Sequence, residues 1–146
     1  EEEVLIAGEE SGGICAGGAL PERDGIRAGL LFWQWLAESA KSFSQLYGEV
    51  ISITGPFAFE RANIELNRNA RNKILEKCSN GTFSHFGRFV VERFEVFDGF
   101  KFFFSESEWL MIRSSGTEPI IRLYAEAGTE ETAQEIIFSG MKAVME

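Results

Sequence analysis

Hydrophobic residues along the chain form two kinds of pattern, short apolar runs and a longer helical segment. The runs at Val4–Ala7, Trp109–Ile112 and Ile120–Ala125 are typical of β-strands. The first run has no polar residue, which predicts a strand buried on both faces, as in a parallel sheet. Asp24 predicts the cap of a helix that extends to about Ala40. This helix is apolar nearly all round, which is typical of a buried rather than an amphipathic helix. Such a strand and helix imply a sheet and neighbouring helices that we do not expect in this chain.

The pattern from residue 48 onward predicts a self-sufficient α+β domain. Asp98-Gly99, between two apolar segments, is the signal of a two-residue type I′ hairpin turn. Apolar residues from Ala133 to Val144 recur at i, i+3, i+4 and i+7, which gives the last helix one inward face. These elements predict an antiparallel sheet with helices on one face. In chain order they are a strand over 57–66, a helix over 67–78 with Ile74 and Cys78 inward, a bent strand over 86–97, a strand over 100–105, two strands flanking residues 113–119, and a helix capped by Thr129.

The composition is that of an acidic globular protein, and it argues against nucleic acids and membranes as partners. The 146 residues are 45% hydrophobic, which is enough apolar material for a core. A net charge of -9 would repel a phosphate backbone, so we expect no nucleic acid partner. The longest apolar stretch, residues 28–37, is too short to span a bilayer, so we expect no membrane partner.

The two cysteines and the first residues of the chain indicate the cellular compartment of the protein. Cys15 and Cys78 match neither the spacing of a metal site nor a C-x-x-C redox pair, and two cysteines cannot form a scaffold of several bridges. The chain opens with three glutamates rather than with the basic and then apolar segments of a signal peptide. We therefore predict a reducing, cytoplasmic location.

One polar segment between two predicted strands has the composition of an anion-binding loop. It reads Arg113-Ser114-Ser115-Gly116-Thr117-Glu118-Pro119, and Arg122 follows it. We expect Gly116 to adopt a positive φ, so that successive backbone N–H groups turn toward one anion. The hydroxyls add donors, and the planar guanidinium of Arg113 suits phosphate oxygens. On composition alone, a polar turn with an arginine at its edge is an equal alternative.

Two motifs resemble the α-D-phosphohexomutases, the phosphoglucomutase/phosphomannomutase family. Residues 113–126, RSSGTEPIIRLYAE, are similar to its phosphate-binding loop, and residues 8–13 and 21–26, GEESGG and PERDGI, are similar to its sugar-binding loop and the helix start behind it. The resemblance covers essentially the whole chain. It implies that residues 1–47, ending in a helical turn or two through Tyr47, are the end of the family's third α/β domain. Residues 48–146 would be its fourth domain, with a TATA-box-binding-protein-like fold.

The resemblance also implies the residues that bind phosphate. The implied ligands are Arg113, Ser115, Gly116 through its backbone N–H, and Thr117, with Ser114 as a further candidate. Arg122 is either a second phosphate ligand or a structural partner of Glu126. Glu118 would repel a dianion, and we expect it to orient Arg113 or Arg122.

In the upstream loop, the resemblance selects Glu9 and Ser11 as ligands of the sugar hydroxyls. A carboxylate accepts from two neighbouring hydroxyls, and a serine hydroxyl complements it. The alternative is a solvated acidic loop at the carboxyl end of a strand. We also expect Arg23 to brace this loop. Relatives often carry Lys and His where this chain has Gly17 and Ala19, so the preferred hexose stays open. By analogy, the Glu-Glu-Ser sequence favours glucose or mannose phosphates.

The family's catalytic groups do not match this sequence. Asp24 and Asp98 are the only aspartates, whereas the family's magnesium site needs an aspartate cluster. Ser84-His85 lacks the threonine- or alanine-rich context of the family's phosphoserine, and we interpret His85 as a loop or strand-edge histidine. We therefore expect no cofactor in this chain and Mg²⁺ in the full-length enzyme.

These observations predict the C-terminal fragment of a phosphohexomutase, an intramolecular phosphotransferase that interconverts hexose 1-phosphate and 6-phosphate. The fragment would bind the sugar hydroxyls and the non-transferred phosphate, and would be inactive alone. Its partners would be the phosphosugar substrate and the remaining domains of the same polypeptide. The alternative is a non-catalytic module that binds sugar phosphates or other anions.

Overall fold

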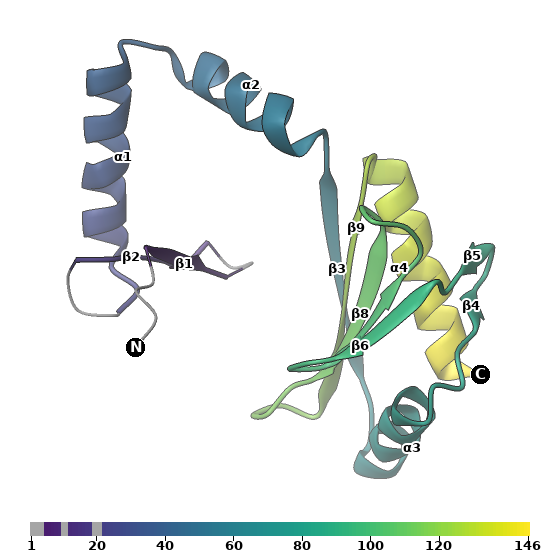
Figure 1. The fold of residues 1–146 in the computed structure, drawn as a ribbon. Helices are drawn as coiled ribbons and strands as arrows, with labels where there is room; N and C mark the ends of the chain where they lie inside the picture. Colours follow the sequence, from purple (N-terminus) through teal and green to yellow (C-terminus); the bar gives the residue numbers. More distant parts are fainter. Residues whose placement is uncertain (1–4, 10–11, 19–21) are drawn as a thin grey trace. The chain divides into compact units, whose positions relative to one another are not determined.

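A computed structural model describes residues 5–9, 12–18 and 22–146 of the chain. Contacts divide the chain into two compact units, Glu1–Ile53 and Thr54–Glu146 (Figure 1). The boundary expected after residue 47 falls inside helix α2 (Phe43–Thr54), which is longer than the one or two turns predicted. Gly48 lies within this helix, where a glycine costs about 1 kcal/mol without ending the helix.

The first unit consists of a hairpin and two helices. Strands β1 (Ile6–Gly8) and β2 (Ile14–Ala16) pair antiparallel. Helix α1 (Gly25–Ser39) begins as predicted, because the Asp24 carboxylate accepts hydrogen bonds from the backbone N–H groups of residues 26 and 27, each at 3.0 Å.

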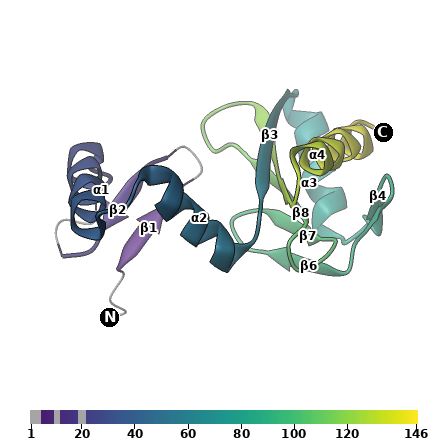
Figure 2. The same cartoon turned by 90° about the horizontal axis from the view of Figure 1, so that it is seen from above.

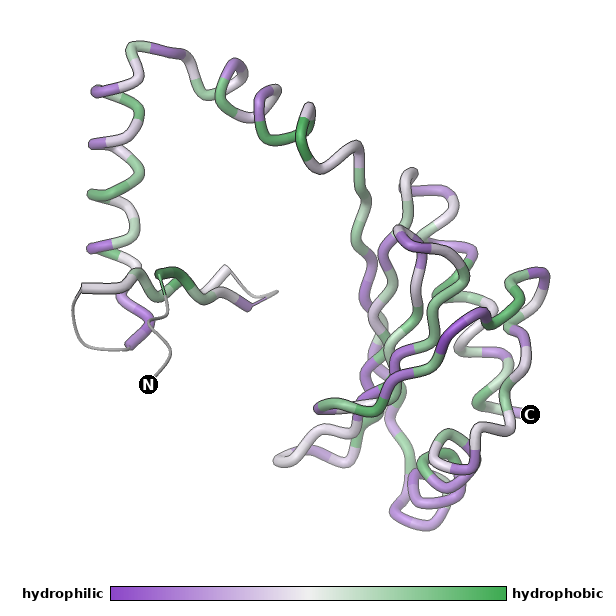
Figure 3. Tube along the Cα trace, in the orientation of Figure 1, coloured by the Kyte–Doolittle hydropathy of each residue, from purple (hydrophilic) through white to green (hydrophobic). Residues whose placement is uncertain are grey.

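The first unit leaves its interior-type strand and helix exposed, as expected for elements whose covering sheet and helices this chain does not contain. Strand β1 is exposed and pairs antiparallel, and α1 has no buried residue, with Trp33 73% exposed. An apolar segment is buried only where another surface covers it. The described residues of this unit offer only a two-stranded hairpin and α2 as cover, and no residue of α1 is buried. Figure 3 shows the hydrophobic residues that recur along this helix.

The second unit confirms the predicted α+β fold. Its antiparallel sheet has the strand order β3-β9-β8-β7-β6. Helices α3 and α4 cover one face of this sheet (Figure 2). The bounds are β3 (Ala58–Glu65), α3 (Arg68–Ser79), β6 (Arg93–Val96), β7 (Phe100–Phe103), β8 (Trp109–Ser114), β9 (Ile120–Ala127) and α4 (Glu130–Met145).

The core lies between the sheet and these two helices. Alternate residues of the central strands, Leu110 and Ile112 on β8 and Leu123 on β9, are fully buried, as is Ile136 on α4. Gly140 lets α4 approach the sheet closely, since a Cβ there would lie 2.8 Å from Leu110 Cδ2. The predicted inward residues of α3 and the predicted Thr129 cap of α4 are also confirmed, and Asn67 caps α3.

The long bent strand predicted over 86–97 is wrong. The chain instead forms a two-stranded hairpin of β4 (His85–Phe86) and β5 (Phe89–Val90), and then the separate strand β6. Gly87 makes the first turn with φ +56, beside Ser139 of α4. The hairpin between β6 and β7 exists as predicted, but Val96 pairs with Phe100, so its loop has three residues rather than two.

Candidate anion-binding site

Three connections meet at one end of the five-stranded sheet. Because neighbouring strands are antiparallel, the β8–β9 loop and the tip of the β6–β7 hairpin extend from the same end (Figure 1). The start of α3 lies there too, since the Leu66 N–H donates to the Pro119 carbonyl at 3.1 Å. The Ser115 N–H donates to the Ile120 carbonyl at 3.1 Å and closes the β8–β9 loop. The predicted anion loop is therefore anchored on a rigid sheet.

Two arginines lie directly opposite each other at the base of this loop. Arg113 on β8 and Arg122 on β9 are partners in the strand register, so both project from the face of the sheet that the helices leave open. Like charges in such a pair repel each other. Each guanidinium has its own carboxylate, Asp98 Oδ2 at 3.2 Å from Arg113 Nη2 and Glu118 Oε2 at 3.1 Å from Arg122 Nη2. The pair therefore depends on nearby anions.

Arg122 is the more firmly held of the two. Hydrogen bonds to the Tyr124 hydroxyl and to Glu118 raise the pKa of Arg122. Its Nε is buried without a hydrogen-bond partner among the described residues. The sequence offered Glu126 as its structural partner, but the ion pair is with Glu118. Glu118 was expected to orient either Arg113 or Arg122, and it contacts Arg122.

Within the loop, the two serines already have hydrogen bonds. The Ser115 side chain is 8% exposed, and its hydroxyl accepts from the Glu118 N–H at 3.3 Å. The Ser114 hydroxyl donates to the Ser115 carbonyl, also at 3.3 Å. A hydroxyl that accepts can still donate one hydrogen bond. Ser115 thus retains a donor, whereas the Ser114 hydroxyl is committed to the loop.

Gly116 and Thr117 form the exposed tip of the loop. Within the part of the chain that the structure describes, neither of their N–H groups nor the Thr117 hydroxyl makes a hydrogen bond. The positive φ predicted for Gly116 is wrong, because its φ lies outside that region. The Ser115 hydroxyl bond to Glu118 turns the loop instead. The tip still offers three donors beside an arginine, as an anion requires.

The upstream loop is only partly described. Ser11 lies outside the described residues. Glu9, between β1 and β2, is ion-paired with Arg23, so the predicted brace is present. Arg27 supports the other side of this hairpin, since its guanidinium donates to the carbonyls of Ala16 at 2.7 Å and Gly17 at 2.9 Å.

Other candidate chemistry does not assemble into a site. Among residues 5–9, 12–18 and 22–146, no three His, Cys, Asp or Glu side chains gather as a metal site requires. The Ser84 hydroxyl and His85 Nδ1 are 3.1 Å apart, but both residues are exposed neighbours in sequence. No described helix is long and apolar enough to cross a membrane.

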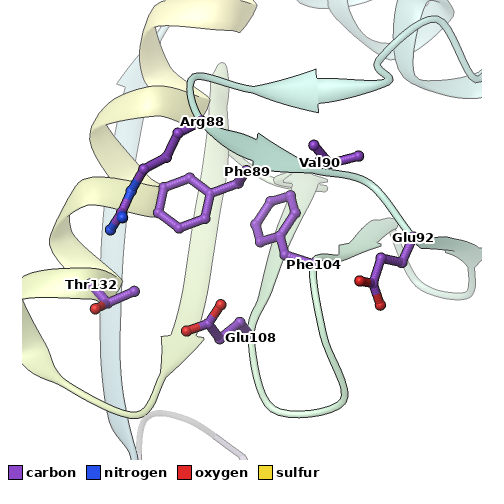
Figure 4. A pocket seen from close by; sticks show the side chains of 7 residues that line it. All are labelled: Arg88, Phe89, Val90, Glu92, Phe104, Glu108 and Thr132. Atoms are coloured by element: carbon purple, nitrogen blue, oxygen red, sulfur yellow. The ribbon is translucent and has the colours of Figure 1, made fainter.

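A separate hollow of about 470 Å³ lies away from the loop, beside α4, β5 and the β7–β8 connection (Figure 4). Arg88 stands over the Phe89 ring at 5.0 Å and pairs with Glu135 at 2.6 Å. Glu92, Glu108 and Thr132 complete its polar lining. None of these residues was predicted to bind a ligand.

The fold is that of an α+β domain, and the two arginines with the loop tip are a candidate anion site at one end of its sheet. The sequence comparisons agree: residues 63–137 match the model of the phosphoglucomutase/phosphomannomutase C-terminal domain, and residues 1–53 match that of the family's alpha/beta/alpha domain III. The chain belongs to the phosphoglucomutase/phosphomannomutase family, as its motifs predicted.

Individual relatives cover the whole chain. It is 31% identical to a phosphoglucomutase/phosphomannomutase of Thermococcus kodakarensis, over 100% of this chain and 30% of that protein. It is 28% identical to a phosphoglucosamine mutase of Methanococcus maripaludis, over 97% of this chain and 30% of that protein. The chain thus spans about 30% of the length of these relatives.

A solved structure shares the fold. A phosphoglucomutase/phosphomannomutase family protein from Burkholderia thailandensis superposes with a TM-score of 0.68. The two are 21% identical in sequence, and the match covers 96% of this chain and 28% of that one.

Proposed function

We propose that the full-length protein is a phosphohexomutase that interconverts hexose 1-phosphate and 6-phosphate, and that this chain is its C-terminal portion. Family membership and the names of the relatives, which include phosphoglucomutase/phosphomannomutase and phosphoglucosamine mutase, support this proposal. The observation that carries it furthest is the pair of arginines beneath a loop tip with three unused donors.

In this proposal the β8–β9 loop holds the phosphate that does not react. Arg113 supplies a charged fork, and the N–H groups of Gly116 and Thr117 supply neutral donors from a second direction. The Thr117 and Ser115 hydroxyls complete the set, and Arg122 neutralises the dianion from the next strand. A bound phosphate at one end fixes the distance of the other end from the reacting group, which accelerates transfer by positioning.

The first unit contributes the sugar contacts in the same proposal. Glu9 accepts from the hexose hydroxyls, and the proposal keeps Ser11 as its partner. Arg23 holds the Glu9 carboxylate in place before the sugar arrives. The preferred hexose stays open, and the Glu-Glu-Ser sequence of this loop favours glucose or mannose phosphates only by analogy.

Phosphoryl transfer itself needs groups that the described residues do not supply. A magnesium ion would neutralise the phosphate oxygens and needs near-octahedral oxygen ligands. The described residues do not fit such a site. We therefore assign the magnesium ion and the phosphoserine to other parts of a cytoplasmic full-length protein, and expect the 146-residue chain to bind sugar phosphate without converting it.

The test is a ¹⁵N titration of this chain with glucose 6-phosphate. We expect the amide signals of residues 114–117 to shift at millimolar ligand, while those around Arg88 and Glu108 stay in place. Sodium chloride at the same ionic strength is the control for screening. If the loop signals respond equally to chloride and to the sugar phosphate, the anion site is refuted.

The second candidate is a non-catalytic module that binds sugar phosphates. It depends on the same arginines and loop-tip donors, which could bind a sugar phosphate without any turnover. Mutase assays of the full-length polypeptide with glucose 1-phosphate and magnesium separate the two. Turnover supports the enzyme, and tight binding without turnover supports the module.

A further inference from the structure

The tip of the β6–β7 hairpin brings a carboxylate to the predicted phosphate ligand. Asp98 Oδ2 lies 3.2 Å from Arg113 Nη2, on a different pair of strands from the β8–β9 loop. We propose that Asp98 is an internal counter-anion: it holds the Arg113 guanidinium when no ligand is present, and the phosphate of the ligand displaces it. This inference rests on the proposed function of the loop.

The backbone brings Asp98 to this position by an unusual local conformation. Asp98 has φ 51, in the left-handed region, which asparagine and aspartate tolerate better than other residues with a side chain. Gly99 follows with φ 148, and a Cβ there would lie 2.8 Å from Met111 Cε and 3.3 Å from Arg113 Cβ. The hairpin tip is therefore packed against β8 at Arg113, and the ion pair is a product of this packing.

The contact between Asp98 and Arg113 is easily exchanged for another anion. Both side chains are open to solvent, 60% exposed for Asp98 and 42% for Arg113. An exposed pair of this kind changes an equilibrium by only about two- to fivefold. A phosphate offers two oxygens to the guanidinium fork and accepts from the N–H groups of Gly116 and Thr117 as well. The ligand therefore makes more contacts than the carboxylate it replaces.

Arg122 provides the contrast within the same site. It is 27% exposed, it has two partners in Glu118 and Tyr124, and its Nε is buried. Displacing Glu118 would not free this guanidinium. Arg113 is thus the arginine that changes partner, and Arg122 is the fixed charge beside it. A bound dianion would then repel the released Asp98 carboxylate, which opposes binding.

The matched variants are Asp98→Asn and Glu95→Gln. Asparagine keeps the left-handed backbone and removes the charge, so we expect Asp98→Asn to fold. Glu95 lies on the same hairpin and is ion-paired with Arg93. In the strand register, Glu95 lies two strands away from Arg113 and is level with Met111, two residues before Arg113. This places it about 12 Å from Arg113. At 0.15 M salt this exceeds the screening length of about 8 Å.

The experiment titrates the wild type and both variants with inorganic phosphate at 0.15 M salt. We expect Asp98→Asn to bind phosphate roughly two- to fivefold more tightly than wild type, and Glu95→Gln to bind like wild type. Asp24 and Asp98 are the only aspartates, so ¹³C labelling of aspartate gives two carboxyl signals. Phosphate should shift the Asp98 signal and leave the Asp24 signal unchanged, since Asp24 caps α1.

The outcomes separate this inference from the proposed function. If wild type binds phosphate at residues 114–117 and Asp98→Asn binds equally or less tightly, the displacement is refuted and the phosphate site stands. An equal gain in Glu95→Gln also refutes it, because the effect would then be one of net charge. If neither wild type nor Asp98→Asn binds phosphate, both ideas fail together.

Discussion

Replacing Arg113 by alanine tests the proposed phosphate site at its central residue. The substitution removes a guanidinium whose hydrogen bonds to a phosphate are worth about 1.5–3 kcal/mol, because the partners are charged. The wild type gives up the exposed Asp98 pair on binding, which offsets about 0.2–1 kcal/mol of that gain. The difference is about 1–2 kcal/mol, which corresponds to roughly five- to thirtyfold weaker binding.

Lysine at the same position separates charge from geometry. Arg113→Lys keeps the positive charge but loses the planar fork that matches two phosphate oxygens. We therefore expect Arg113→Lys to bind with an affinity between those of wild type and Arg113→Ala. Arg88→Ala is the matched control, because Arg88 is also an exposed, ion-paired arginine but lines the separate hollow (Figure 4).

The assay is a titration with glucose 6-phosphate, followed by calorimetry or by the amide signals of the loop, at one fixed salt concentration. Arg88→Ala should bind within twofold of wild type. If Arg113→Ala also binds like wild type while the loop signals still shift, then the loop amides alone hold the phosphate. The role assigned to the guanidinium would then be wrong.

Three further predictions concern the stability and reactivity of the chain. Ile136→Ala, at a fully buried position of α4, should lower the free energy of unfolding by about 2–5 kcal/mol in urea, because it leaves a cavity in the core. Gly87→Ala should lower the free energy of unfolding by about 1–3 kcal/mol, because φ is +56 and the new Cβ would lie 2.7 Å from Ser139 Oγ. Gly29→Ala is its control, because a Cβ at Gly29 would have no neighbouring atom within 4 Å. Burial raises the pKa of the Cys78 thiol from 9.0 to about 12, although Lys77 nearby opposes the shift, so the thiol should resist alkylation at pH 8 while Cys15 reacts. The Cys78 thiol keeps its proton to a higher pH in the folded state than in the unfolded state. Its contribution to the free energy of unfolding is therefore fully present below about pH 9 and is lost as the pH rises toward 12. Rapid alkylation of Cys78 in the native chain would contradict its burial.

Local signals in the sequence sufficed for much of the second unit. Caps and helical periodicity depend on residues within one or two turns, so the helix that Thr129 caps could be placed from the sequence. The break in the strand predicted over 86–97 could not be predicted from the sequence. Gly87 turns the chain beside Ser139 of α4, which lies more than fifty residues away in sequence. A tertiary contact of this kind leaves no periodic signal.

The candidate site was also predictable from the sequence only in part. The motif identified the loop, and the two flanking strands followed from their apolar runs. Glu118 was expected to pair with Arg113 or Arg122, but the Asp98 partner of Arg113 was not predictable, because it depends on the packing of another hairpin. Asp98 reaches Arg113 through the packing of the β6–β7 hairpin against β8, and Glu118 reaches Arg122 across a turn. The exposure of α1 is of the same kind, because hydrophobicity predicts which face can be covered and not what covers it.

The proposed phosphate site offers an explanation for the placement of Arg113 opposite Arg122. Packing does not require a second cation there, and two like charges across neighbouring strands destabilise a sheet. The chain compensates with one carboxylate from each adjacent loop, and exposed ion pairs recover little free energy. A ligand with two negative charges would neutralise both guanidiniums at once and use the free N–H groups of the loop tip. On the proposed function, binding of a dianion should therefore raise the unfolding midpoint of the second unit more than binding of a monoanion at the same ionic strength.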